Sequence, residues 1–74
     1  MSDAFSQVVK KHREKNGISR AALAGMAGLH QTYVGLLERK ERSPNLDTAK
    51  AIADALRVPL SQMVAEAEQT CRKR

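Results

Sequence analysis

Residues 18–39 constrain the chain most, because they hold one short helix, its end and the start of a second helix. The hydroxyl of Ser19 can cap the first helix by accepting a hydrogen bond from an amide of the first turn. Apolar residues then recur at helical spacing, namely Leu23, Ala24 and Ala27. Gly28 supplies the positive φ that ends such a helix. A second periodic segment begins a few residues later, and its pattern turns Val34 and Leu37 inward.

Two helices joined by so tight a turn must cross steeply, which is the geometry of a helix-turn-helix. The second helix carries three polar residues at its exposed front, namely Gln31, Thr32 and Tyr33. In a helix-turn-helix the second helix enters the major groove of DNA with its first turn against the bases. The stretch therefore predicts a recognition helix over residues 30–39.

The rest of the chain favours helices as well. Aromatic residues make up 3% of the 74 residues, and Leu, Ile, Val and Ala dominate the apolar set, which favours helices over strands. We predict one all-α domain over residues 1–74, with helices at about residues 3–16, 19–27, 30–39, 45–56 and 60–71. In the fourth helix, Asn45 is the expected N-cap, and the apolar face is expected to hold Leu46, Ala49, Ile52, Ala53 and Leu56.

Two polar residues of the first helix are expected to find partners inside the fold. Phe5, Val9 and His12 share one face at helical spacing, so we expect His12 to be partly buried with its hydrogen bonds satisfied. Arg13 lies at the border of that face, and a buried guanidinium is tolerated only when it is paired with an acid. Glu38, near the end of the recognition helix, is the candidate, so we predict a structural ion pair between Arg13 and Glu38.

The charge of the chain is compatible with a polyanionic partner. Thirteen Lys and Arg against eight Asp and Glu give a net charge of +5, with an isoelectric point near 9.9. A solvated basic surface explains this charge equally well, so charge alone does not decide for nucleic acid.

Other classes of function lack the residues that they need. Cys71 is the only cysteine, so no intramolecular disulfide can form, and His12, His30 and Cys71 have no metal-binding spacing. The sequence also has no Gly-rich phosphate loop and no nucleophile elbow. We therefore expect no enzyme, no cofactor or metal and no small-molecule ligand.

No signal for a membrane or for export is found. No apolar run approaches about 18 residues, and the first residues lack a signal-peptide pattern. An amphipathic membrane helix would carry Lys or Arg where residues 60–71 carry Glu66 and Glu68. We expect a cytoplasmic protein that does not bind a membrane.

Residues 5–64 together resemble the Cro/cI-type, or XRE-like, helix-turn-helix family of phage repressors and small bacterial regulators. The resemblance lies in the joint spacing of Arg13, Gly17, Ile18, Ser19, Leu23, Ala24, Ala27, Gly28, Leu29, Glu38, Arg39, Pro44, Leu46, Ile52, Ala53 and Leu56. It implies a compact five-helix, lambda-repressor-like fold and a transcription regulator that binds double-stranded DNA. Residues 31–35, in a chain of this length, also look like the controller proteins of restriction-modification systems.

The resemblance implies particular roles at the DNA. Contacts to bases are implied for Gln31, Thr32, Tyr33 and Leu36, although packing explains Leu36 and Tyr33 as well. Contacts to phosphates are implied for Arg20, His30, Arg39, Lys40, Arg42 and Ser43, and His30 is alternatively the cap of the recognition helix. Relatives usually have Gln at Arg20, Leu at His12 and Gly at Lys40. At this last position the glycine takes the left-handed conformation that ends the helix, so Lys40 must adopt it at a cost or end the helix differently.

A domain of this size gains stability from a partner that covers more apolar surface. We expect a homodimer on a roughly palindromic operator, with Leu60, Val64 and Ala67 in the interface. The alternative is an antitoxin-type module that binds a partner protein as well as DNA.

Overall fold

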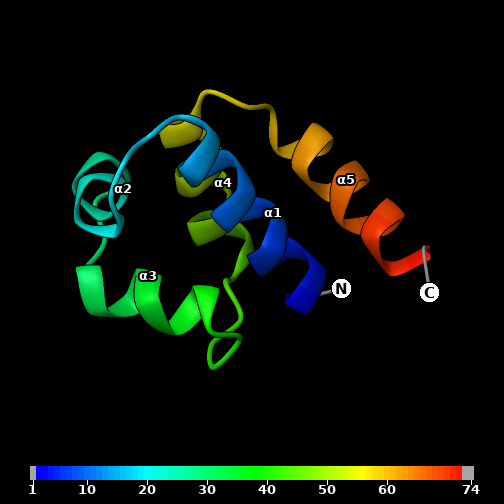
Figure 1. Cartoon of the computed structure of the whole chain (residues 1–74), viewed down its shortest axis with the longest axis horizontal. Coiled ribbons are helices and arrows are strands. Elements are labelled where there is room, and N and C mark those ends of the chain that lie inside the picture. Colours follow the sequence, from blue (N-terminus) through cyan, green and yellow to red (C-terminus); the bar gives the residue numbers. More distant parts are fainter. Residues whose placement is uncertain (1, 73–74) are drawn as a thin grey trace.

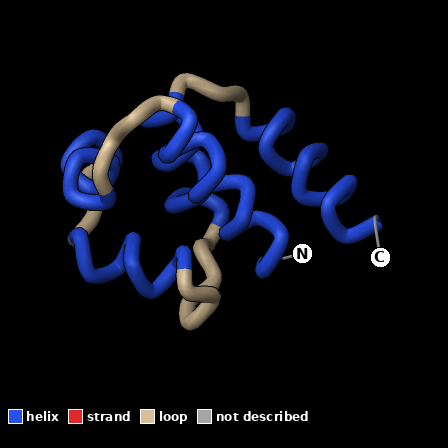
Figure 2. Tube along the Cα trace, in the orientation of Figure 1, coloured by secondary structure: helices blue, strands red, loops and turns tan. Residues whose placement is uncertain are grey.

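The computed structural model describes residues 2–72, with side chains described for residues 4–70, and Cys71 lies outside that side-chain range. It contains five helices, which Figure 1 labels: α1 (Ser2–Lys15), α2 (Arg20–Ala27), α3 (Gln31–Glu38), α4 (Leu46–Leu56) and α5 (Leu60–Arg72). Residues 2–72 contain no strand, and Figure 2 shows helices joined by loops throughout. The predicted all-α class with five helices is confirmed.

The first four helices end with the same backbone arrangement. At the end of α1, the amide of Gly17 bonds to the carbonyl of Glu14 and the amide of Ile18 to that of Arg13, at 3.0 and 3.2 Å. The same two bonds recur at the ends of α2, α3 and α4, around Gly28, Lys40 and Arg57 respectively. This Schellman motif requires a residue in the left-handed region.

Two of these four ends use a residue other than glycine. Gly17 and Gly28 have φ values of 69° and 71°, while Lys40 and Arg57 have φ values of 66° and 59°. A side chain in this region costs about 1 kcal/mol relative to glycine. Lys40 therefore takes the conformation that the family glycine would take, and the loop after α3 keeps its path.

The two predicted caps are present at the starts of α2 and α4. Ser19 Oγ accepts a hydrogen bond from the amide of Ala22 at 3.0 Å. Asn45 Oδ1 accepts one from the amide of Thr48 at 2.8 Å. Each bond satisfies an amide that has no partner inside its helix.

The core lies where the helices meet. Here α1 packs along α5, and α2 packs against α3 and α4. The largest apolar side chains that are fully buried are Leu23, Leu37, Ile52, Met63, Val9 and Val34. Ser6 is also buried, and its Oγ has no hydrogen-bond partner among the described residues. Each helix thus contributes to one core that holds α3 in place.

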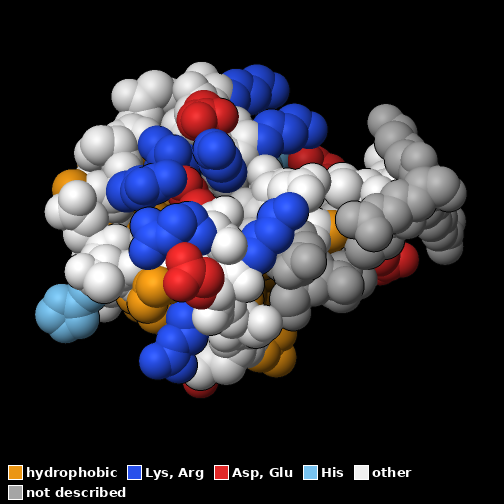
Figure 3. Space-filling view, turned by 60° about the horizontal axis from the view of Figure 1, so that its bottom comes forward, with side chains coloured by type: hydrophobic (Ala, Val, Ile, Leu, Met, Phe, Trp, Pro, Cys, Tyr) orange, Lys and Arg blue, Asp and Glu red, His pale blue; other side chains and the backbone are white. Residues whose placement is uncertain are grey.

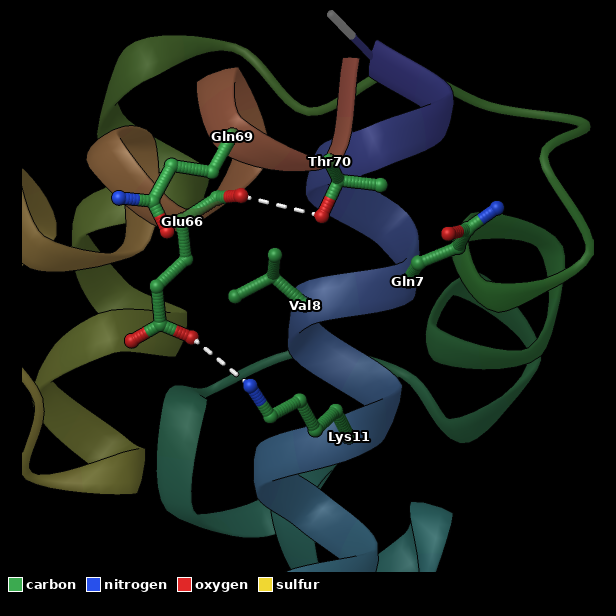
Figure 4. Close-up of a pocket in the computed structure, with 6 residues that line it drawn as sticks. All are labelled: Gln7, Val8, Lys11, Glu66, Gln69 and Thr70. Atoms are coloured by element: carbon green, nitrogen blue, oxygen red, sulfur yellow. Dashed lines mark hydrogen bonds and ion pairs between the residues drawn. The ribbon is translucent and has the colours of Figure 1, made fainter. Parts of the chain in front are cut away.

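The seam between α1 and α5 is closed by polar side chains. His12 is 8% exposed, and its Nε2 lies 3.0 Å from Oε1 of Glu66, so the expected burial and pairing of this histidine are confirmed. Figure 4 shows the adjoining hollow, in which Lys11 reaches the same carboxylate at 3.4 Å and Thr70 donates to the backbone oxygen of Glu66. Val8 lies between them. These contacts fix α5 against α1.

None of the helices within residues 2–72 combines the length and the apolar character that crossing a membrane requires.

Candidate nucleic-acid interface

The helix α3 has one buried face and one exposed face. Val34 and Leu37 are fully buried, whereas Gln31 and Thr32 are exposed and Tyr33 and Leu36 are half-buried. The buried pair anchors the helix in the core. The side chains expected to contact bases therefore lie on the outer surface, or partly on it.

Glu38 lies at the centre of an ion-pair network at the end of α3. Arg13 donates from Nε to Oε2 at 2.6 Å and from Nη2 to Oε1 at 3.1 Å, and Arg20 donates from Nε to Oε1 at 3.1 Å. Arg13 Nη1 also donates to the carbonyl of Ile18 at 2.8 Å. The ion pair predicted for Arg13 and Glu38 is thus present, and sequence reasoning missed the share that Arg20 takes in it.

Burial and hydrogen bonding act on Glu38 in opposite directions. The carboxylate side chain is only 1% exposed, and this burial by itself raises its pKa. The hydrogen bonds and charges of Arg13 and Arg20 together outweigh burial, so the pKa of Glu38 is lowered from its ordinary value of 4.5. The ionised carboxylate therefore holds α1, α2 and α3 together.

Arg20 combines this internal contact with an exposed surface. It is the first residue of α2, and 40% of its side chain is exposed. Its printed hydrogen bond to Glu38 uses Nε, so the exposed end of the guanidinium is held at the helix N-terminus in a fixed direction. A cation fixed in this way, beside helical amides, suits a phosphate oxygen.

Arg39 lies back over α3. A Cβ atom on Gly35 would come within 3.3 Å of Nη1 of Arg39, so the guanidinium covers the place where a side chain would stand. Arg39 Nε donates to Oε2 of Glu41 at 2.8 Å, and both side chains are about half exposed. Gly35 therefore makes room for Arg39 and is itself buried.

The start of α3 differs from the expected cap. His30 occupies the N-cap position with an extended backbone, but its side chain makes no capping hydrogen bond. Its backbone carbonyl instead accepts from the amides of Tyr33 and Val34 at 3.0 and 3.2 Å. The capping role expected for His30 is wrong, and the side chain is exposed beside the first turn.

Basic side chains continue into the loop after α3. Lys40, Arg42 and Ser43 are all exposed. Figure 3 turns the α3 side of the molecule forward, and Lys and Arg side chains gather on this face with a few acidic side chains between them. A helix with a polar front and a basic surround has the charge and the shape that an electronegative groove requires.

Comparison with known proteins decides the family. The sequence model of the helix-turn-helix family matches residues 9–63. The chain belongs to the helix-turn-helix family. As a Cro/cI-type member, it is a DNA-binding transcriptional regulator.

Several relatives of this helix-turn-helix protein are controller proteins. The control protein C.SmaI of Serratia marcescens is 34% identical over 64 residues, which are 86% of this chain and 76% of that protein. The crystal structure of the restriction-modification controller protein C.AhdI from Aeromonas hydrophila has 31% identity and a TM-score of 0.79, over 82% of this chain and 92% of that one. A mutant of C.Esp1396I, solved bound to its highest-affinity operator site, has 25% identity and a TM-score of 0.77, over 88% and 91%.

The surface expected to hold a second copy needs one correction. Leu60 and Val64 are half-buried, but Ala67 is fully buried in the core of the single chain, so its side chain cannot contact a partner. Ala67 lies one helical turn beyond Met63 on the core side of α5, and the sequence pattern did not separate the two faces of this helix.

An exposed leucine lies beside this surface instead. Leu46 was expected in the core, but it is 75% exposed, and sequence reasoning missed it. Together with Phe5, Ala49, Leu60 and Val64, it lines an apolar hollow of about 250 Å³. Its place directly after the N-cap, where the chain enters α4, was the available signal, because a first-turn side chain can point out past the core.

Among the residues that the structure describes, no three His, Cys, Asp or Glu side chains are grouped closely enough to hold a metal ion.

Proposed function

We propose that this regulator binds a palindromic operator as a homodimer, with α3 of each copy in the major groove. The observation that carries the proposal is the exposed front of α3, where Gln31 and Thr32 stand free of the core beside Arg20 and the basic loop. The operator complex of the related C.Esp1396I mutant supports it, since the two folds superpose over most of both chains.

Base contacts are assigned to the front of α3. The amide of Gln31 can pair with N6 and N7 of adenine, a contact that contributes about 1 to 3 kcal/mol of discrimination. Thr32 offers a hydroxyl to several bases and a methyl group to thymine. Tyr33 and Leu36 are half-buried, so each offers only one edge to the groove.

Phosphate contacts are assigned to the residues around α3. Arg20 presents its exposed end at the start of α2, and His30 stands beside the start of α3. Arg39, Lys40, Arg42 and Ser43 form the far border. These groups position the domain on the duplex and carry little sequence information.

The dimer is assigned to the hollow around Leu46. A leucine that is 75% exposed beside Leu60 and Val64 leaves apolar surface that a second copy can cover. A two-fold axis through this surface would place two α3 helices in successive major grooves, about 34 to 36 Å apart.

The proposal is tested by selecting bound sequences from a random duplex pool at about physiological salt. Two related half-sites about one helical turn apart are expected, and Gln31→Ala is expected to lose preference at one base position.

The matched control is Arg42→Gln, because it removes a charge without touching the front of α3. It is expected to weaken all sequences alike and to lower the salt slope by about 0.9. A selected pool without sequence preference, or a preference that Gln31→Ala leaves unchanged, would contradict the proposal.

A further inference from the structure

A second hollow lies on the side of the molecule away from α3. It has a volume of about 530 Å³ and is formed by the end of α1, the end of α2 and the linker between α4 and α5. In Figure 1 this linker and α3 lie at opposite ends of the view. When α3 occupies a groove, the hollow therefore faces away from the duplex.

The floor of this linker hollow is apolar. Ile18, Val58 and Leu56 contribute to it, and Met26 stands at its edge with 55% of its surface exposed. Met26 and Leu46 are the large apolar residues that the described part of the chain leaves exposed, and the proposed dimer covers only Leu46. A flexible, polarizable methionine is a common contact on surfaces that bind peptides of varied shape.

The rim of the linker hollow is positive. Lys15 and Arg57 line it, and neither forms an ion pair with a described carboxylate. His12 also lines it, but Nε2 of His12 is engaged by Glu66. No lining residue is acidic. The surface thus combines an apolar floor with cations that lack an internal counter-charge.

Arg57 stands at this rim in a strained conformation. Its φ of 59° is one that glycine adopts without cost, so the helix end alone does not require an arginine. Non-glycine residues in the left-handed region are held at a cost, and such strain is found most often at functional sites.

We propose that the linker hollow docks an acidic peptide segment of a partner protein, one that carries at least one aliphatic side chain. The aliphatic group packs against Met26 and Val58, and carboxylates of the segment meet Lys15 and Arg57. Nucleic acid fits this surface poorly, because a phosphate backbone offers nothing to an apolar floor. A regulator that docks such a segment can hold DNA with one side and a protein with the other.

The test is an NMR titration of the full chain with a short synthetic peptide that alternates glutamate and leucine. Amide shifts are expected to move around Ile18, Met26 and Val58. A peptide with serine for leucine, and one with glutamine for glutamate, are both expected to bind at least about threefold more weakly.

Two variants form a matched pair. Arg57→Gly and Lys40→Gly each remove one cation, and each places glycine at a left-handed helix end, so neither threatens the fold. Arg57→Gly is expected to weaken peptide binding by about three- to fivefold and to leave operator binding within about twofold. Lys40→Gly is expected to leave peptide binding unchanged.

Three results would overturn the proposal: shifts that gather on α3, equal losses in the two variants, or no shifts at all at millimolar peptide. None of them bears on operator binding, which the duplex selection measures separately.

Discussion

At the scale of single residues, Lys40 shows a cost that the fold tolerates. Its φ of 66° completes the Schellman motif after α3, although its side chain crowds its own backbone there. Lys40→Gly is therefore expected to raise the free energy of unfolding by about 1 kcal/mol, while DNA binding weakens through the lost charge. Urea denaturation and operator titration measure the two effects. A fall in stability would show that Lys40 makes a contact that offsets its strain.

Ser6 is a second residue whose cost is local. Its Oγ is buried without a hydrogen-bond partner among the described residues, and an unsatisfied buried hydroxyl loses its hydration without compensation. Ser6→Ala is expected to stabilise the protein by about 1 kcal/mol in thermal or urea unfolding. Ser61→Ala, at an exposed position, serves as the control and is expected to change stability by less than about 0.5 kcal/mol. A loss of stability in Ser6→Ala would indicate a partner such as an internal water.

At the scale of helices, the Glu38 network joins α1, α2 and α3. Removing the negative charge leaves the nearly buried guanidinium of Arg13 without its counter-ion, so Glu38→Gln is expected to cost about 3 kcal/mol of unfolding free energy. Glu41→Gln breaks only an exposed pair with Arg39 and should cost less than about 1 kcal/mol. Equal costs in these two variants would show that solvent already screens the Glu38 pair.

The same network predicts a dependence on pH. The pKa of Glu38 is lower in the folded state than its ordinary value of 4.5, so the carboxylate stabilises the fold above that pH. This stabilisation is lost as the pH falls from about 4.5 through the folded pKa, because the proton then binds preferentially to the unfolded chain. Unfolding curves from pH 6 to pH 3 should therefore be flatter for Glu38→Gln than for the natural chain. Parallel curves would assign the acid sensitivity to other carboxylates.

Helices and their ends were predictable because each has a local signal. Ser19 and Asn45 announce caps, and Gly17 and Gly28 announce left-handed ends. His30 stands where a cap is expected, but an imidazole at that position did not reach the amides of its own helix. Contacts between helices, such as Arg20 to Glu38, have no such signal, because they depend on how α2 and α3 cross.

At the scale of the whole molecule, Leu46 decides how copies associate. Leu46→Glu is expected to keep the fold, because the side chain is 75% exposed, and to shift a dimer toward monomer by placing charge in an apolar contact. Sedimentation velocity at tens of micromolar measures the change, and circular dichroism checks the fold. Met26→Glu, at the other exposed apolar position, serves as the control. Monomer alone for the natural chain would contradict the proposed dimer.

The whole-molecule surface was the part least open to prediction. Helical periodicity placed Leu46 in the core and Ala67 on the outside, and the structure reverses both. Each lies near an end of its helix, where the packing angle of a neighbour decides which side is covered. The hollow beside Arg57 likewise arises from three segments distant in sequence.

The brevity of α3 has a consequence for regulation. Eight residues are too few to stay helical in water alone, so the shape that meets DNA exists only while the surrounding helices support it. Damage to a remote contact, such as that of His12 with Glu66, would thus lower promoter occupancy by thinning the population of competent molecules rather than by altering what each one recognises. Extra protein should restore such a mutant's control of its gene, whereas a defect in the reading residues would persist at any dose.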